Sequence, residues 1–519
     1  MKTVLHKRLL FVTLASSVAA WNLAGCGGGA GSGGSSPSTF APLSSASFEA
    51  EPSGGNWKPI VLSSADNVAS LDSGAASQTG SQTRGASKAP AVTEQERAEL
   101  RTLQARRTSG ATEVARFWNV GASVRWNEIA RSLVMKYKTS PPVASRQYAA
   151  LSVAQYDAMV AAFKIKYKAN RPSPSTQDSS LKPLFPNESD PVYPSSHATV
   201  SGASARVLAK FYPAESQFLA DKAREAEESR LYAGLNYRSD IVAGGALGRD
   251  VADKVLAHVA KDGADAQLGN SRRSQTEWWS FKTNAEGNGN GARKAPSSGT
   301  DPSRWTGVNP LLPRWGEVKT WVVPSVVALR PAAPPKMDSA QFKADLAEVR
   351  RISDNRTAEQ LRIAQFWADG AGTATPPGHW NQIAADLLVE KRTSELRSAR
   401  AFALLNMALM DAGICCWDAK YKYYLLRPWM ADPKITTPVG QPNFPTYTSG
   451  HSTFSGAAAE VLGSIFPDKK SRLDAMATEA SMSRIYGGIH FRFDCEPAVE
   501  GGRKIGQLVI KRGERDGSK

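Results

Sequence analysis

Basic residues and a Ser-Gly-His triplet in the second half of the chain have the types and spacing that an oxyanion site needs. Lys420 and Arg427 are seven residues apart, so a helix would place both on one face, two turns apart. Ser449 and Gly450 stand just before a run of small residues at 453–466 that has helical periodicity. The amino end of such a helix offers free backbone amides, a hydroxyl and a favourable dipole to an anion.

Two histidines and a third cation accompany these groups. His451 completes the Ser-Gly-His triplet, and Arg484 stands six residues before His490. Two arginines and a lysine in one pocket repel each other unless an oxyanion lies between them. One histidine can then ligate or attack the bound group while the other transfers protons. The alternative, a helix cap with an incidental histidine, does not explain all of these positions together.

The three blocks carry a family resemblance. Lys-x6-Arg-Pro at 420–428, Ser-Gly-His at 449–451 and Ser-Arg-x5-His-x3-Asp at 483–494 resemble the signature of vanadium-dependent haloperoxidases and type 2 phosphatidic acid phosphatases. Thr448 departs from the pattern, which usually has proline there. The resemblance covers most of 360–510 and, more weakly, the first half of the chain.

The resemblance implies a role for each matched residue. His490 would bind vanadium axially, or attack phosphorus in a phosphatase, and His451 would be the acid–base group. Lys420 would hold an oxygen and polarise bound peroxide, and Asp494 would orient a site histidine or arginine from behind. The groups expected to hold the equatorial oxygens are Arg427, Arg484, Ser449 and the amide of Gly450.

Two activities therefore remain open, because vanadate has the shape and charge of phosphate. A haloperoxidase would use vanadate, hydrogen peroxide, a halide and an organic acceptor. A phosphatase would hydrolyse phosphate esters through a phosphohistidine. Trp417 and Phe444 match positions where fungal-type vanadium chloroperoxidases have Trp and Phe, which favours halide chemistry, although both are equally typical of core aromatics. A non-catalytic surface protein with a relic anion pocket is a third reading, and the retention of both histidines argues against it.

The elements that must position these residues are predicted to be helices. Helical periodicity covers 142–165, 198–230, 241–261, 338–370, 381–427, 453–466 and 470–486, and β-branched alternation is scarce, so the fold is mainly α. Segments of the first half return in the second: 114–133 as 363–387, 151–172 as 404–428, 193–213 as 447–467 and 229–240 as 483–494. The pairs His197–His451, Arg230–Arg484 and Asp240–Asp494 are each 254 residues apart. This common offset predicts a tandem duplication that forms two related helical bundles.

The first copy of the repeat lacks one essential group. It has Lys164-x6-Arg171-Pro172, Ser195-Ser196-His197 and Ser229-Arg230, but Asn236 stands where the second copy has His490. Asparagine is neither a nucleophile nor a strong axial ligand, so we expect the first copy to be degenerate and inactive.

Composition divides the chain into five regions. Residues 1–26 are predicted to be a lipoprotein signal peptide that ends in the lipobox-like Leu23–Cys26, and 27–95 a disordered Gly/Ser-rich tether. Residues 96–264 would form the degenerate N-terminal bundle, 265–335 a long connection, and 336–519 the C-terminal bundle with the active site.

The targeting segment also sets the expected location and partners. We expect an exported bacterial lipoprotein of the outer membrane, facing the periplasm or the cell surface and held by its lipid alone. The formal net charge is +16, but the basic residues are dispersed along the chain. Because an exported protein rarely meets nucleic acid, we do not expect nucleic acid as a partner. An oxidising compartment would allow a disulfide between Cys495 and either Cys415 or Cys416.

Overall fold

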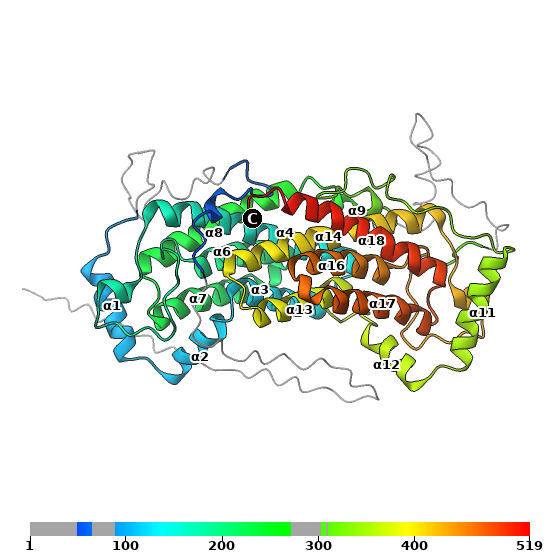
Figure 1. The fold of residues 1–519 in the computed structure, drawn as a ribbon, viewed down its shortest axis with the longest axis horizontal. Helices are drawn as coiled ribbons and strands as arrows, with labels where there is room; N and C mark the ends of the chain where they lie inside the picture. The colour runs from blue at the N-terminus through cyan, green and yellow to red at the C-terminus, as the bar shows by residue number, and fades with distance from the viewer. Residues whose placement is uncertain (1–48, 65–88, 271–302, 308–309, 519) are drawn as a thin grey trace, which may run out of the picture. The chain divides into compact units, whose positions relative to one another are not determined.

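The computed structural model describes residues 49–64, 89–270, 303–307 and 310–518, all within one compact unit, Thr39–Lys519. Within these residues the regular structure is helical and no strand occurs, which confirms the mainly α fold (Figure 1). The predicted signal peptide and the greater part of the predicted tether lie outside the described residues.

The principal helices occur in two matched sets. The first copy contains α3 (Ala122–Lys136), α4 (Pro141–Ala169), α6 (Ser196–Phe211), α7 (Ser216–Ala233) and α8 (Arg238–Val259). The second contains α13 (Thr375–Glu390), α14 (Glu395–Tyr423), α16 (Gly450–Ile465), α17 (Lys470–Tyr486) and α18 (Arg492–Gly513). Helices α4 and α14, α6 and α16, and α8 and α18 begin and end 254 residues apart, so the repeat seen in the sequence is also a repeat of structure.

Shorter elements connect and cover these sets. They are α1 (Glu94–Ala105), α2 (Ser109–Trp118), α5 (Pro174–Gln177), α9 (Ala264–Asn270), α11 (Ala340–Asp354), α12 (Ala358–Phe366) and α15 (Pro428–Ala431). Single 3-10 turns occur at Gly54–Asn56, Pro213–Glu215, Trp315–Glu317 and Pro467–Lys469.

The two copies share one hydrophobic core around the packed pair α4 and α14. Asn127 Nδ2 donates to Asn381 Oδ1 at 2.7 Å, and Asn406 Nδ2 donates to Ser152 Oγ at 2.9 Å. Each bond joins a residue to its own counterpart in the other copy, as happens at a two-fold axis. Helix α14 is long and apolar enough to cross a membrane, but 94% of its most apolar window is buried, as in the core helix of a globular fold.

Two short segments correct the predicted tether and connection. Asp157 accepts hydrogen bonds from the backbone amides of residues 60–62, and Asp411 accepts the equivalent bonds from residues 321–323. Trp57, within the predicted tether, is 2% exposed. The low-complexity composition around 49–62 obscured a short apolar run that packs on α4, so both segments are parts of the repeat.

Candidate oxyanion-binding active site

The Ser-Gly-His loop is fixed by the start of α16 and by α18. Ser449 is the N-cap of α16, and its side chain accepts a hydrogen bond from the amide of Ser452 at 3.3 Å. The amide of Ser449 donates to the carbonyl of Asp494 at 3.0 Å. A Cβ on Gly450 would meet only the Trp417 ring, at 3.7 Å, so the glycine leaves this side of the loop open. The amino end of α16 therefore faces the site, as the sequence predicted.

Three cations are buried around this loop. Lys420, Arg427 and Arg484 are at most 1% exposed. Lys420 Nζ donates to the carbonyls of Pro445 (3.0 Å) and Thr446 (2.8 Å). Burial lowers the pKa of Lys420 to about 7, that of Arg427 to about 9 and that of Arg484 to about 10. Burial makes the charged forms of these three side chains unfavourable, and a bound anion would stabilise them.

Arg427 holds an unused donor. Its Nε donates to the carbonyl of Phe444 at 3.0 Å, and its Nη1 donates to the carbonyl of Ile489 at 2.7 Å and faces His490 Nε2 at 3.0 Å. Its Nη2 is buried without a partner, and so is Asp494 Oδ1. A buried guanidinium with a free N–H is unfavourable unless a ligand accepts it, so this atom marks a place that fits an oxyanion.

Both histidines are neutral at pH 7. Burial, together with nearby Arg427 and Lys420, holds the pKa of His490 well below its usual value. Burial and Arg484, whose Nη1 lies 3.0 Å from His451 Nε2, do the same to the pKa of His451. Each ring therefore has one nitrogen lone pair available at neutral pH.

A cavity of about 470 Å³ opens beside these groups. Its wall includes six of the predicted site residues: Trp417, Phe444, Gly450, His451, Arg484 and His490. The other predicted residues, Lys420, Arg427, Ser449 and Asp494, are not part of the wall but contact or adjoin residues that are. Residues 138–141, from the loop after α3 to the first residue of α4, line the same cavity, so the first copy contributes to the site of the second.

The two predicted pocket aromatics pack against each other. The rings of Trp417 and Phe444 are 5.1 Å apart. Lys420 Nζ and the guanidinium carbon of Arg427 each lie 5.0 Å from the centre of the Phe444 ring. Phe444 is thus an apolar wall that also stabilises two cations through its π face.

The lysine of the first copy that corresponds to Lys420 is not the one that the spacing in the sequence indicated. The structural counterpart of Lys420 is Lys166, whose Nζ donates to the carbonyl of Pro191 at 2.7 Å, as Lys420 does to Pro445. Lys164, which the x6 spacing singled out, bonds Asn56 instead. Between α14 and Arg427 there are two more residues than between α4 and Arg171. A lysine seven residues before the arginine therefore lies at a different position on the helix in each copy.

Carboxylates lie close to the cations of the first copy. Arg171 forms a buried ion pair with Asp240, and Lys166 Nζ lies 3.9 Å from Glu188 Oε2. Glu395, from the second copy, accepts from the amides of Ala122 and Ser123 at the start of α3, and its charge also acts on Arg230. Protein carboxylates take the place of an oxyanion here, and the loss of activity in this copy stays a prediction.

Thr446 is a site residue that the sequence analysis missed. Its hydroxyl donates to Asp494 Oδ2 at 2.5 Å and lies 3.1 Å from His490 Nδ1. His490 Nδ1 is also 3.0 Å from Asp494 Oδ2, so Asp494 orients the histidine as expected. The sequence carried one signal for this residue: the copies differ here, with Val192 in the first copy at the position of Thr446 in the second.

The expected disulfide is absent. Cys415, Cys416 and Cys495 are buried free thiols. Cys416 Sγ donates to the carbonyl of Thr448 at 3.4 Å, and Cys495 Sγ donates to that of Ser481 at 3.7 Å. Each of these two thiols therefore bonds a different backbone carbonyl. The positions of cysteines in the sequence do not show which thiols the packing of the helices brings together.

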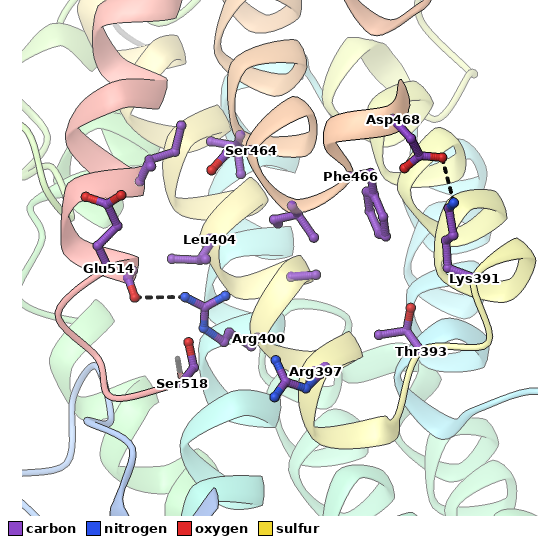
Figure 2. A pocket seen from close by; sticks show the side chains of 15 residues that line it. Lys391, Thr393, Arg397, Arg400, Leu404, Ser464, Phe466, Asp468, Glu514 and Ser518 are labelled. Carbon is purple, nitrogen blue, oxygen red and sulfur yellow. Dashed lines mark hydrogen bonds and ion pairs between the residues drawn. The ribbon is translucent and has the colours of Figure 1, made fainter. Parts of the chain in front are cut away.

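The basic side chains that line a second cavity, of about 520 Å³, have carboxylate partners (Figure 2), among them Arg397 with Glu51. Lys391 pairs with Asp468 at 2.6 Å, and Arg400 pairs with Asp516 at 2.7 Å and the carbonyl of Gly513 at 2.8 Å. Among the described residues, no group of three or more His, Cys, Asp or Glu side chains is placed to hold a metal cation. The cavity beside His490 is therefore the candidate active site.

Comparisons with known proteins agree with this geometry. Residues 467–516 match the family model of the second helical-bundle domain of vanadium chloroperoxidase. A vanadium chloroperoxidase of Curvularia inaequalis is 28% identical over 27% of this chain, a match that spans 29% of that relative's length.

Solved structures match over a larger part of the chain. A bacterial vanadium-dependent iodoperoxidase is 26% identical, with a TM-score of 0.55 over 76% of this chain and 97% of that one. A bacterial vanadium-dependent chloroperoxidase in its holo form shares the fold, with 14% identity and a TM-score of 0.52 over 74% of this chain and 93% of that one. The chain is thus similar to vanadium haloperoxidases in sequence and in fold. Because the relatives named here are haloperoxidases, the phosphatase alternative is not favoured.

Proposed function

We propose that this protein is a vanadium-dependent haloperoxidase that oxidises a halide with hydrogen peroxide to a hypohalous species, which then halogenates an organic acceptor. One observation carries the proposal. The second copy keeps a buried guanidinium N–H of Arg427 without a partner beside the neutral ring of His490, whereas the first copy pairs its equivalent arginine with Asp240. Of these two arginines, only Arg171 forms an ion pair with a carboxylate.

Vanadate fits this pocket by charge and by donor type. The residues that would hold it are Lys420, Arg427, Ser449, the amide of Gly450, Arg484 and His490. When bound, vanadate supplies an electrophilic centre at which hydrogen peroxide becomes reactive towards halide.

The protein's own groups bind, orient and exclude water. His490 presents Nε2 as a lone-pair donor, because Nδ1 faces Asp494 and Thr446. The neutral ring of His451 accepts the proton that hydrogen peroxide loses, and Arg484 keeps that ring oriented. Phe444 keeps one wall apolar, so the charges act in a medium of low dielectric constant.

Two assays on one purified sample test the proposal. After addition of vanadate, we expect bromination or iodination of a β-diketone that depends on hydrogen peroxide, with chloride measured separately. Hydrolysis of a phosphomonoester by the vanadate-free protein, without any halogenation, would overturn the proposal. Full activity of His490→Ala would show that the site is elsewhere.

For localisation, the proposal is an exported lipoprotein anchored through Cys26. It is supported by the sequence alone: Lys2, Lys7 and Arg8, then an apolar run at 9–20, precede the lipobox-like Leu23–Cys26. Labelling of the expressed protein with radioactive palmitate, lost in Cys26→Ser, tests it; equal labelling of both proteins would contradict it.

A further inference from the structure

The duplication allows a comparison within one chain, because the same aspartate has different partners in the two copies. In the first copy Asp240 pairs with Arg171 and accepts from the amide of Tyr237 at 2.7 Å. In the second, Asp494 accepts from the equivalent amide of Phe491 at 2.9 Å but forms no hydrogen bond or ion pair with Arg427. Its Oδ2 bonds His490 and Thr446 instead.

Two of the positions that differ around the aspartate supply its hydrogen-bonding side chains in the second copy. The second copy has Thr446 and His490, and the first has Val192 and Asn236 at the same offset of 254. Asn236 Nδ2 donates to the carbonyl of Val192 at 3.1 Å and not to Asp240. Where the hydroxyl and the imidazole are missing, the carboxylate bonds the arginine.

Counting protons assigns the tautomer of His490. A threonine hydroxyl has one hydrogen, and Thr446 is 2.5 Å from Asp494 Oδ2, a carboxylate oxygen that can only accept. The Thr446 oxygen can therefore only accept from His490 Nδ1, 3.1 Å away. Nδ1 must carry the ring proton, which leaves the lone pair on Nε2, opposite Arg427 Nη1 at 3.0 Å.

We propose that Thr446 is a positioning residue that holds Asp494 on His490 and away from Arg427. It does so with one buried hydroxyl that binds both the carboxylate and the imidazole. The hydroxyl has two effects: it fixes the His490 tautomer that presents Nε2, and it keeps the Arg427 Nη2 donor free for an oxyanion. The second effect rests on the proposed function, whereas the first is a property of the vanadate-free protein.

Thr446→Val tests the proposal, because valine has nearly the same shape and already stands at the matching position of the first copy. Thr446→Ser, which restores only the hydroxyl, is the control. The first readout is ¹⁵N NMR of the histidine rings in vanadate-free protein, which distinguishes the two neutral tautomers; the chain has six histidines. His490→Asn identifies the His490 signal by its disappearance.

We expect wild type and Thr446→Ser to show His490 protonated on Nδ1, and Thr446→Val to show a mixture of tautomers. The second readout is the vanadate dissociation constant, which should rise about tenfold in Thr446→Val, as for loss of one charge-assisted contact, and recover in Thr446→Ser. Circular dichroism and thermal unfolding check that each variant is folded.

Other results would overturn the proposal. If Thr446→Val keeps a single Nδ1–H tautomer, or if serine fails to restore it, the hydroxyl does not position His490. Weaker vanadate binding with an unchanged tautomer would also overturn it, since the loss would then come from general damage. If wild type neither binds vanadate nor halogenates, the proposed function fails, but the tautomer result still decides the role of Thr446.

Discussion

Arg427 and Arg171 are predicted to respond in opposite ways to the same substitution. Both are buried arginines of matching copies, but Arg171 is paired with Asp240, and Arg427 has a free Nη2. We expect Arg427→Met to weaken vanadate binding with little loss of stability. We expect Arg171→Met to lower stability and leave vanadate binding unchanged.

The magnitudes follow from these contacts. A hydrogen bond to a charged group contributes about 1.5–3 kcal/mol, so loss of the Arg427 contact raises the vanadate dissociation constant about 10- to 150-fold. Its removal also leaves the carbonyls of Phe444 and Ile489 unpaired, at about 1 kcal/mol each, which the loss of a costly buried charge partly offsets. Removing Arg171 leaves the carboxylate of Asp240 buried without its ion-pair partner, which costs about 3–5 kcal/mol.

Calorimetric titration with orthovanadate gives the affinity, and thermal unfolding in vanadate-free buffer gives the stability. Each variant is the control for the other, because both lose the buried arginine of the Arg-Pro pair that follows the long helix of its copy. The reasoning is refuted if Arg171→Met weakens vanadate binding as much as Arg427→Met, or if Arg427→Met is the less stable of the two.

Three further predictions follow from the same contacts. Burial lowers the pKa of Lys420 to about 7, so its amine is charged below that pH and neutral above it. The vanadate dissociation constant should therefore rise with pH above 7, by up to about tenfold per unit for one linked proton. Lys420→Met should remove this pH dependence of the dissociation constant. The protonation of vanadate itself affects wild type and variant equally, so the difference between their pH profiles reports on Lys420. Equal slopes of the two profiles would contradict the prediction. Asp411→Ala leaves the amides of residues 321–323 without their acceptor and should lower the free energy of unfolding by about 3 kcal/mol, measured in denaturant. Unchanged stability would show that these bonds are dispensable. Lys138→Glu reverses a charge on the cavity wall and should raise the KM for halide about two- to tenfold at low salt, with a smaller effect at high salt. Arg392→Glu, at the matching position of the other copy, should leave it unchanged.

Much of the fold was predictable because its signals are local. The apolar period of 453–466 predicted a helix, and α16 spans Gly450–Ile465. The offset of 254 predicted matched helices, and α4 and α14 have the same length and register. Local propensity and periodicity depend on neighbouring residues, so a single sequence carries them.

Features that depend on loop length or on distant packing were missed. Two extra residues after α14 made Lys164, rather than Lys166, look like the counterpart of Lys420. The apolar run near Trp57 was hidden by its surroundings, and the expected disulfide of Cys495 assumed a proximity of thiols that the helices do not provide.

The sequence by itself determined the residue types at the site: His451, His490 and the cations that an oxyanion needs, at the spacing of the vanadium haloperoxidases. Only the tertiary structure decided which copy keeps those charges available for a ligand. Some of the carboxylates that act on the cations of the first copy come from distant parts of the chain; Glu395, whose charge acts on Arg230, belongs to the second copy. Such compensation acts through space and leaves no periodic signal, because electrostatic interactions depend on distance and burial and not on sequence separation.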